Sequence, residues 1–235
     1  MSDVDPGLRA AAAAAIGLVN DGARVGLGTG RAAAAFIALL GERVQDGLRV
    51  SGVATSEESA RQAEALGIRL VGLDEETELD LTVDGADEVT PDLDMVKGWG
   101  GALVRERIVA SVSRRQVILV GPEKLVKALG ERGRIPIEVI PLARGPVVRR
   151  LRALKLRIVA RTVPGAGGLF TTDNGNLILD CSVAAPLDGT AARTLDAAIR
   201  AIPGVVDTGL FLGTAERVLV GHPDGRVETL QRRGR

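Results

Sequence analysis

The stretch Arg24-Val25-Gly26-Leu27-Gly28-Thr29-Gly30 decides the fold, because it has the pattern of a short apolar strand that enters a glycine turn. The residues that follow, 32–40, are rich in alanine and leucine and favour a helix. A strand, a glycine turn and a helix in this order are typical of the units that build an open α/β sheet.

The same alternation of strands and helices extends outward from this stretch. Asp5 and Pro6 are suited to cap and begin an alanine-rich helix, and Asn20-Asp21-Gly22 supplies its stop. The neighbouring strands are apolar without alternation, which indicates burial on both sides. We therefore predict an α/β fold, a parallel sheet with helices on both faces. Its further strands are expected at 48–54, 68–73, 79–83 and 116–120, and its further helices at 57–66 and 102–112.

The second half of the chain has a different pattern. The turn Asp173-Asn174-Gly175 is a strong hairpin signal between strands at 169–172 and 176–180. A strand at 137–140, a basic helix at 146–154 and a helix at 190–201 surround this hairpin, and strands at 205–212 and 218–220 follow. We therefore predict an α/β domain at 1–131 and 205–235, with a smaller α+β domain at 132–204 inserted into it.

The composition excludes several classes of partner and site. The 235 residues include 30 basic and 30 acidic side chains, so we expect no nucleic-acid binding, which normally begins with an excess of positive charge. Apolar stretches are short and the start of the chain lacks a signal-peptide pattern, so we expect no membrane span and a cytoplasmic protein. One cysteine, Cys181, and one histidine, His222, leave no disulfide framework and no multi-histidine zinc site.

The glycine turn is the first candidate binding site. Open parallel sheets bind ligands beyond the carboxyl ends of their strands, where free backbone N–H groups at a helix N-terminus suit a phosphate. A dinucleotide fingerprint would need glycine at Arg31 and an acidic residue after the next strand, where Thr55-Ser56 stands, so a nicotinamide cofactor is not expected. The alternative is that these glycines only permit a tight turn.

Acidic and basic side chains follow the strand predicted at 79–83. We expect Asp84, Asp87 and Glu88 at the rim of the sheet, where this strand ends. Lys97 precedes a second glycine turn, and Glu106 falls early in a predicted helix. Helix N-termini favour carboxylates, and such a set around a phosphate site can transfer protons. The alternatives are a solvated acidic loop, a magnesium site completed by substrate phosphates, or a surface helix that carries Glu106.

Eight short motifs in this order resemble the type A ribose-5-phosphate isomerases, and the resemblance spans nearly the whole chain. It implies a Rossmann-like domain with an inserted lid domain, assembled as a homodimer or a dimer of dimers. It also implies interconversion of ribose 5-phosphate and ribulose 5-phosphate through a cis-enediol, without metal or organic cofactor. The motifs are GLGTG (26–30), TSEES (55–59), VDGADE (83–88), KGWGGALVRER (97–107), EK (123–124), PIEVIPLA (136–143), TDNGN (172–176) and PGVVDTGLF (203–211).

The resemblance also implies a role for each site residue. Glu106 matches the base that moves a proton between C1 and C2. Asp84 and Asp87 match residues that handle hydroxyl protons during ring opening, and Lys97 matches one that stabilises negative charge on oxygen. The implied substrate-binding residues are Gly28, Thr29, Gly30, Arg31, Ala32, Gly85, Gly98 and Lys124.

The chain departs from the family pattern at several positions. Arg31-Ala32 stand where the family commonly has Ser-Thr, so two hydroxyl donors to the phosphate are missing, and Arg31 either compensates or points to solvent. Trp99 replaces a usual glycine, and Gly121-Pro122 lacks an aspartate before Lys124. A sugar-phosphate-binding sensor module, or an isomerase for another phosphorylated sugar, are the alternative functions.

Overall fold

Two units share the chain in alternating segments. The computed structural model describes residues 5–165 and 167–232. Unit 1 comprises Met1–Ala86, Arg105–Leu125 and Thr214–Arg235, and unit 2 comprises Asp87–Val104 and Val126–Gly213. Each unit contains its own sheet and its own apolar core.

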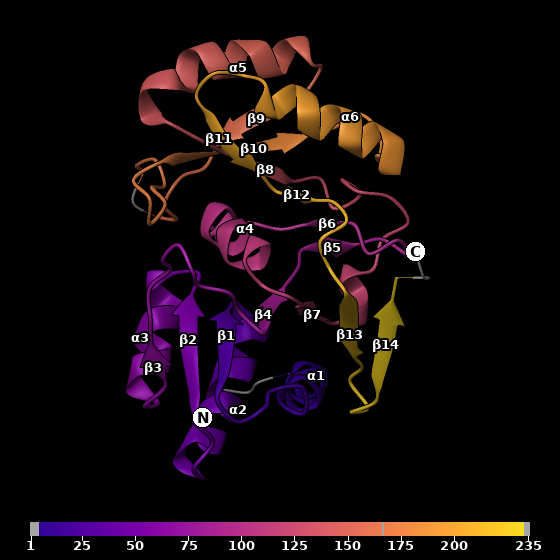
Figure 1. Ribbon diagram of the computed structural model, residues 1–235. Helices are drawn as coiled ribbons and strands as arrows, with labels where there is room; N and C mark the ends of the chain where they lie inside the picture. Colours follow the sequence, from indigo (N-terminus) through magenta and orange to yellow (C-terminus); the bar gives the residue numbers. More distant parts are fainter. Residues whose placement is uncertain (1–4, 166, 233–235) are drawn as a thin grey trace. The chain divides into compact units, whose positions relative to one another are not determined.

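The sheet of unit 1 is parallel apart from one edge strand, as the apolar strand pattern predicts (Figure 1). Its strand order is β14-β13-β7-β4-β1-β2-β3, in which only β14 runs antiparallel to its neighbour β13. The strands are β1 (Ala23–Leu27), β2 (Val50–Ala54), β3 (Arg69–Leu70), β4 (Leu81–Gly85), β7 (Gln116–Val120), β13 (Arg217–Gly221) and β14 (Val227–Gln231).

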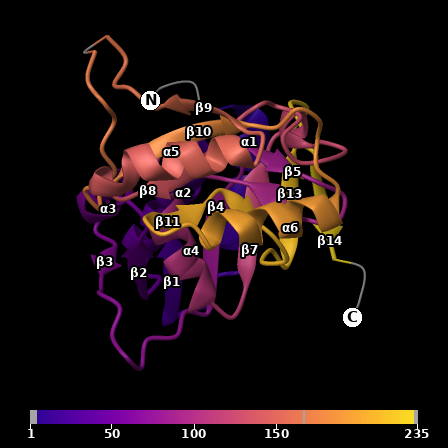
Figure 2. The same ribbon diagram turned by 90° about the horizontal axis from the view of Figure 1, so that it is seen from above.

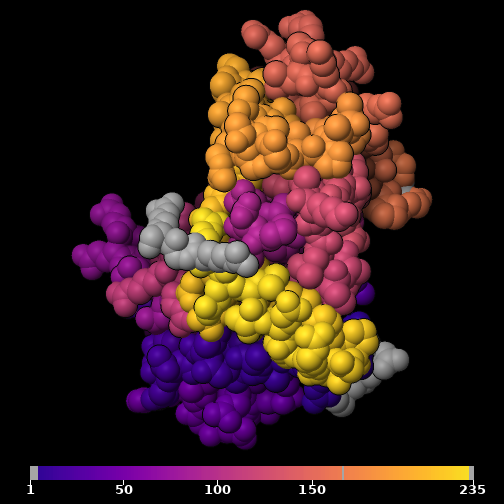
Figure 3. All heavy atoms as spheres, turned by 90° about the vertical axis from the view of Figure 1, so that its right-hand side faces the viewer, coloured from indigo at the N-terminus to yellow at the C-terminus, as the bar shows by residue number. Residues whose placement is uncertain are grey.

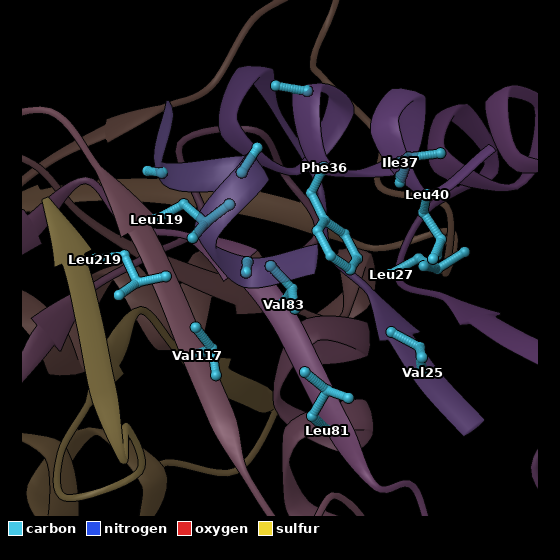
Figure 4. Close-up of a cluster of buried hydrophobic side chains, with 14 of the residues drawn as sticks. Val25, Leu27, Phe36, Ile37, Leu40, Leu81, Val83, Val117, Leu119 and Leu219 are labelled. Atoms are coloured by element: carbon cyan, nitrogen blue, oxygen red, sulfur yellow. The ribbon is translucent and has the colours of Figure 1, made fainter. Parts of the chain in front are cut away.

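Helices cover both faces of this sheet, so the predicted α/β fold is confirmed. Phe36, Ile37 and Leu40 of α2 pack on Val25 and Leu27 of β1 in the main core of the unit (Figure 4). On the other face, Val109 of α4 packs with side chains of β2 and the segment before β4. The helices are α1 (Pro6–Ile16), α2 (Arg31–Gln45), α3 (Glu57–Ala65) and α4 (Leu103–Ser111), the last of which belongs to unit 1 from Arg105 onward.

The N-terminal end of α1 was predicted correctly, and its C-terminal end was not. Asp5 caps the helix, since its Oδ1 accepts hydrogen bonds from the N–H groups of Gly7 (2.8 Å) and Leu8 (3.1 Å). The helix ends at Ile16, earlier than the stop predicted at residues 20–22. Residues 18 and 19 instead form tight turns, and Gly22 donates its N–H to Arg49 O at 2.6 Å.

The C-terminal hairpin forms the edge of the same sheet. A turn at residues 222–225 joins β13 to β14, with His222 N–H donating to Arg226 O and Gly225 N–H donating to His222 O, both at 2.9 Å. Figure 3 shows these strands, in yellow, on the surface of unit 1 next to the indigo N-terminal residues. None of the helices in the described part of the chain is long and apolar enough to cross a membrane.

Unit 2 is built on an antiparallel sheet with the strand order β11-β8-β10-β9. Helices α5 (Arg144–Ala153) and α6 (Gly189–Arg200) both pack on one face of it, through Val147, Leu151 and Ile199 (Figure 2). The strands are β8 (Ile135–Val139), β9 (Arg157–Ala160), β10 (Leu177–Ser182) and β11 (Val205–Thr208). A smaller sheet joins β5 (Glu88–Val89), β6 (Met95–Val96) and β12 (Leu210–Phe211), and the 3₁₀ turns are η1 (Pro122–Lys124, in unit 1) and η2 (Pro141–Ala143).

The predicted domain boundaries differ from the units of the structure. Residues 205–213 do not return to the larger unit, because β11 pairs with β8 and β12 pairs with β6. Residues 87–104 and 126–131 also belong to unit 2, where Val126 N–H donates to Val89 O at 2.9 Å. The prediction of 1–131 with 205–235, and of 132–204, is therefore wrong at these segments.

The predicted hairpin at residues 169–180 is confirmed only in part. Gly175 has a φ of +77°, and Thr172 N–H donates to Asn176 O at 2.9 Å, so the turn is present. Residues 169–172, however, make isolated bridges instead of a continuous strand. The ladder partners of β10 are β8 and β9.

Candidate active site

The glycine turn lies at the carboxyl edge of the unit 1 sheet and packs against the end of β4. Gly28 N–H donates to Val83 O at 2.9 Å, and Thr29 N–H donates to Asp84 Oδ1 at 3.1 Å. A Cβ atom placed on Gly28 would lie 2.3 Å from Asp84 Oδ1 and 2.6 Å from Asp84 Cα. Only glycine therefore allows this close approach between the turn and the strand end.

Asp84 is 1% exposed, and its carboxylate stabilises the turn. The same Oδ1 that accepts from Thr29 also accepts from Gly85 N–H at 2.7 Å. Two backbone amides therefore hold this carboxylate oxygen in place between the turn and the strand end. Gly85 itself has room for a side chain at ordinary van der Waals distance, 3.6 Å from Ala32 Cβ, so no steric contact restricts this position to glycine.

Three hydroxyl side chains after β2 support the glycine turn from its other side. Thr29 Oγ1 lies 2.7 Å from Thr55 Oγ1, and Ser59 Oγ donates to Gly28 O at 2.6 Å. Ser56 caps α3, accepting from Ser59 N–H at 3.1 Å. The contact of these hydroxyls with the turn was not predicted, and its signal in the sequence is that Thr55 and Ser56 follow a strand next to β1.

The N-terminus of α2 begins directly after the turn. Gly30 is the N-cap residue, with a φ of +93° and no side-chain hydrogen bond to the first turn of the helix. Arg31 is the first helical residue and is exposed, and Ala32 is half-buried. Backbone N–H groups that are left without a capping side chain at a helix N-terminus suit an anion.

Glu106 lies in the N-terminal half of α4 and is 5% exposed. The C-terminal end of α4 is fixed near the start of β4, because Leu79 N–H donates to Val112 O at 2.8 Å. Val109, one helical turn earlier, packs against Gly26 of β1. A Cβ atom on Gly26 would lie 2.6 Å from Cγ1 of Val109. The helix therefore runs toward the amino edge of the sheet, and Glu106 lies on the side of the glycine turn. The surface-helix alternative for Glu106 is wrong, since the side chain is buried.

Lys124 lies at the same edge, after β7. It ends the 3₁₀ turn η1, and its N–H donates to Gly121 O at 3.1 Å. The carboxyl ends of β1, β2, β4 and β7 are adjacent because these strands are parallel neighbours. Unit 1 thus brings the glycine turn, Asp84 and Lys124 to one edge.

The remaining predicted site residues belong to unit 2. Lys97 is 2% exposed, its N–H donates to Gly209 O at 2.9 Å, and its Nζ lies 5.5 Å from the centre of the Phe211 ring. Asp87 is half-buried, and its Oδ2 accepts from Trp99 N–H at 2.9 Å. Gly98 has a φ of +98°, which favours glycine at this position.

Trp99 fits the turn without backbone strain. The positive φ angles of the turn occur at Gly98 and Gly101, so a tryptophan between them is tolerated. Its indole Nε1–H donates to Arg134 O at 3.0 Å. The guanidinium groups of Arg132 and Arg134 lie 5.5 and 4.4 Å from the ring centre, which fixes the ring within unit 2.

Glu88 was expected at the rim of the sheet, but the structure buries it in unit 2. It is fully buried, and its carboxylate accepts from Gly130 N–H at 2.5 Å and Arg132 N–H at 2.7 Å. Burial raises the pKa of Glu88, and these two amide donors oppose that rise. Glu88 therefore holds the 130–132 loop. In the described residues, no three His, Cys, Asp or Glu side chains come together as a metal site.

Comparisons with known proteins give one result. The family model of ribose 5-phosphate isomerase A (phosphoriboisomerase A) matches residues 51–225. Ribose-5-phosphate isomerase A of Gloeobacter violaceus is 48% identical over 231 residues, and the match covers 97% of each chain. The protein of that name from Roseiflexus castenholzii is 46% identical over 94% of this chain and 93% of its own.

Solved structures agree with the sequence relatives. Ribose 5-phosphate isomerase A of Methanocaldococcus jannaschii superposes with a TM-score of 0.89 at 42% identity and covers 97% of this chain and 98% of its own. A D-ribose-5-phosphate isomerase in complex with phospho-erythronic acid superposes with a TM-score of 0.91 at 35% identity, covering 98% and 100%. With its glycine turn, buried Glu106 and these matches over nearly its whole length, the chain belongs to the ribose 5-phosphate isomerase A family.

Proposed function

We propose that this protein interconverts ribose 5-phosphate and ribulose 5-phosphate through a cis-enediolate. The observation that carries the proposal is that Glu106, a carboxylate withdrawn from solvent, lies toward the same sheet edge as the glycine turn. A proton on carbon next to a carbonyl is very weakly acidic, so the reaction needs a positioned base and stabilisation of the negative oxygen.

Each residue has a distinct role in this proposal. The N–H groups at the start of α2 and the turn Gly28-Thr29-Gly30 bind the phosphate, aided by the dipole of α2. Glu106 takes the proton from one of the two carbons and returns it to the other. Lys97, buried against Phe211, stabilises the negative charge that develops on oxygen.

The two aspartates act at the hydroxyl groups. Asp84 and Asp87 transfer hydroxyl protons when the sugar ring opens, and Lys124 contributes a positive charge to substrate binding. Asp84 is supported in this role by the two backbone N–H groups that bind its Oδ1. Gly85 and Gly98 provide backbone close to the substrate, and Arg31 and Ala32 contribute N–H groups of the first helical turn.

The test of this proposal is a coupled assay of the purified protein with ribose 5-phosphate in the presence of a chelator. Glu106→Gln should lower kcat on the order of 10²- to 10⁴-fold, because the amide cannot accept the proton, while KM stays within a small factor. Glu58→Gln on the exposed face of α3 is the matched control and should leave kcat unchanged. Full turnover by Glu106→Gln would refute the assignment of the base, and loss of wild-type activity with chelator would restore the magnesium alternative.

An isomerase for another phosphorylated sugar is the second candidate, favoured by Arg31-Ala32 and Trp99. Compared with the usual family pattern, Arg31-Ala32 remove two hydroxyl donors next to the glycine turn, and Trp99 adds bulk next to Lys97. Assays with other aldose phosphates, run beside ribose 5-phosphate, distinguish the two by their kcat/KM values. A sensor module is disfavoured because it would not need the complete set of Glu106, Lys97 and two aspartates.

We also propose that the protein assembles as a homodimer or a dimer of dimers in the cytoplasm, and that unit 2 serves as a lid or in dimerisation. Light scattering coupled to size-exclusion chromatography would test the assembly. A monomer that keeps full activity would contradict it.

A further inference from the structure

Arg161, which directly follows β9 in unit 2, makes an unusual set of contacts. Its side chain is 10% exposed, and it binds Asp180 through two parallel hydrogen bonds, Nε–H to Oδ2 at 2.9 Å and an Nη2–H to Oδ1 at 2.5 Å. The carboxylate is 12% exposed. Such a buried, bidentate ion pair fixes the plane of the guanidinium group.

The remaining edge of this guanidinium faces the turn that carries Lys97. Nη1 donates to Gly98 O at 3.1 Å and to Trp99 O at 3.0 Å, so one group holds two successive carbonyls. Phe170 packs against the same turn, since a Cβ atom on Gly101 would lie 2.6 Å from its Cζ. The turn is therefore fixed by its carbonyl groups and by its packing.

This turn leads directly to a proposed catalytic group. The peptide whose carbonyl belongs to Gly98 has its N–H on Trp99, and that N–H donates to Asp87 Oδ2 at 2.9 Å. Because a peptide unit is planar, a guanidinium that fixes the carbonyl also fixes the direction of the N–H. The path from Asp180 through Arg161 and the 98–99 peptide to Asp87 lies entirely within unit 2.

We infer that Arg161 is a positioning residue for the proposed isomerase reaction, and that Asp180 orients it. Its planar group holds the 98–99 peptide so that the Trp99 N–H fixes the Asp87 carboxylate and the turn keeps Lys97 in place. Lysine cannot replace it, because a single ammonium group lacks the fixed fork that reaches a carboxylate and two carbonyls at once. This inference rests on the proposed function.

The test compares Arg161→Lys and Arg161→Ala with Arg200→Ala. Arg200 is the matched control, because it also binds a buried carboxylate in unit 2, Asp207 at 2.6 Å, together with Asp196 of its own helix α6. Both Arg161 variants should lower kcat on the order of 10- to 100-fold with a small change in KM, since a displaced catalytic group affects the transition state most. Guanidinium ion, added below its denaturing range, should restore part of the kcat of Arg161→Ala and have no such effect on Arg200→Ala.

The outcomes separate positioning from a purely structural role. Circular dichroism reports the folded fraction of each variant. The inference is overturned if Arg161→Lys keeps the wild-type kcat, or if guanidinium ion does not restore activity to folded Arg161→Ala. It is also overturned if Arg161→Lys cannot fold while Arg200→Ala folds. A wild-type protein without activity on ribose 5-phosphate would refute the proposed function itself, which is a different result.

Discussion

At the scale of single residues, the candidate site is marked by charges that lie almost completely out of water. Lys97, Asp84 and Glu106 are each 5% exposed or less. Charged side chains are seldom buried so deeply unless they are paired or functional, because burial costs the free energy of desolvation. For Asp84, two backbone amides offset this cost. For Asp84 and Glu106, burial combined with a position toward one edge of the unit 1 sheet supports a functional role, and for Lys97 burial within unit 2 supports one.

Arg31 gives a prediction at the same scale. It is the first residue of α2 and is exposed, so its guanidinium is free to reach an anion at the glycine turn. If it replaces the missing hydroxyl donors, Arg31→Ala should raise KM for ribose 5-phosphate about 10-fold and leave kcat nearly unchanged. Arg43→Ala, in the last turn of the same helix, is the control and should not change KM. An unchanged KM for Arg31→Ala would reject the compensating role.

Single residues also show how far a sequence can be interpreted. Asp84, Lys97 and Glu106 could be proposed from the sequence because each lies in a local motif with glycines or at a strand end, and their catalytic roles stay predictions. Arg161 and Ser59 were not, because their roles depend on contacts with Gly98 and Gly28, which lie 63 and 31 residues away in the chain. No local spacing records such a contact.

At the scale of elements, prediction succeeded where a local cause sets the boundary. The strand at 116–120 is β7 without any shift, because its apolar run is short and bounded by polar residues and glycine. Helix α3 begins after the cap Ser56 as expected. The strands β5, β6 and β12 were missed as separate elements, since each has two residues and exists only through pairing with another part of unit 2. Such short pairs carry no periodic signal.

The contact of the glycine turn with β4 gives a prediction at this scale. Gly28→Ala would force its new methyl group against Asp84, including the backbone Cα at 2.6 Å. We expect the free energy of unfolding to fall by about 1 to 3 kcal/mol, because the turn or the strand end must move. The value of kcat/KM should fall as well, since both groups belong to the proposed site. Urea unfolding and the coupled assay measure the two effects.

The control for this prediction is Gly72→Ala. A Cβ atom at Gly72 meets nothing within 4 Å, and its φ is not in the left-handed range, so both stability and kcat/KM should stay close to the wild type. If Gly28→Ala behaves like Gly72→Ala, the close approach of the turn to Asp84 is not required.

At the scale of the whole molecule, the fold class was predictable and the division of the chain was not. Alternating strand and helix patterns indicate a parallel sheet with helices, and unit 1 has one. The chain, however, passes between the units at residues 86–87, 104–105, 125–126 and 213–214. The segment 87–104 belongs to unit 2 because β6 pairs with β12, more than a hundred residues later in the chain.

The stability of the protein at alkaline pH gives the last prediction. Cys181 is 1% exposed in the core of unit 2, and burial, with a smaller contribution from Asp180, raises the pKa of its thiol from 9.0 to about 12. The unfolded chain can ionise this thiol near its ordinary pKa while the folded chain cannot. The contribution of this thiol to the free energy of unfolding should therefore stay constant below pH 9 and fall by about 1.4 kcal/mol per pH unit between pH 9 and pH 12. No tyrosine titrates in this window, because the sequence contains none.

The variant Cys181→Ala has no thiol and so lacks this dependence on pH. The free energy of unfolding of the wild type, measured by urea unfolding, should therefore fall relative to that of Cys181→Ala between pH 8 and pH 10. A difference that stays constant over this range would show that the thiol titrates alike in the folded and unfolded chain.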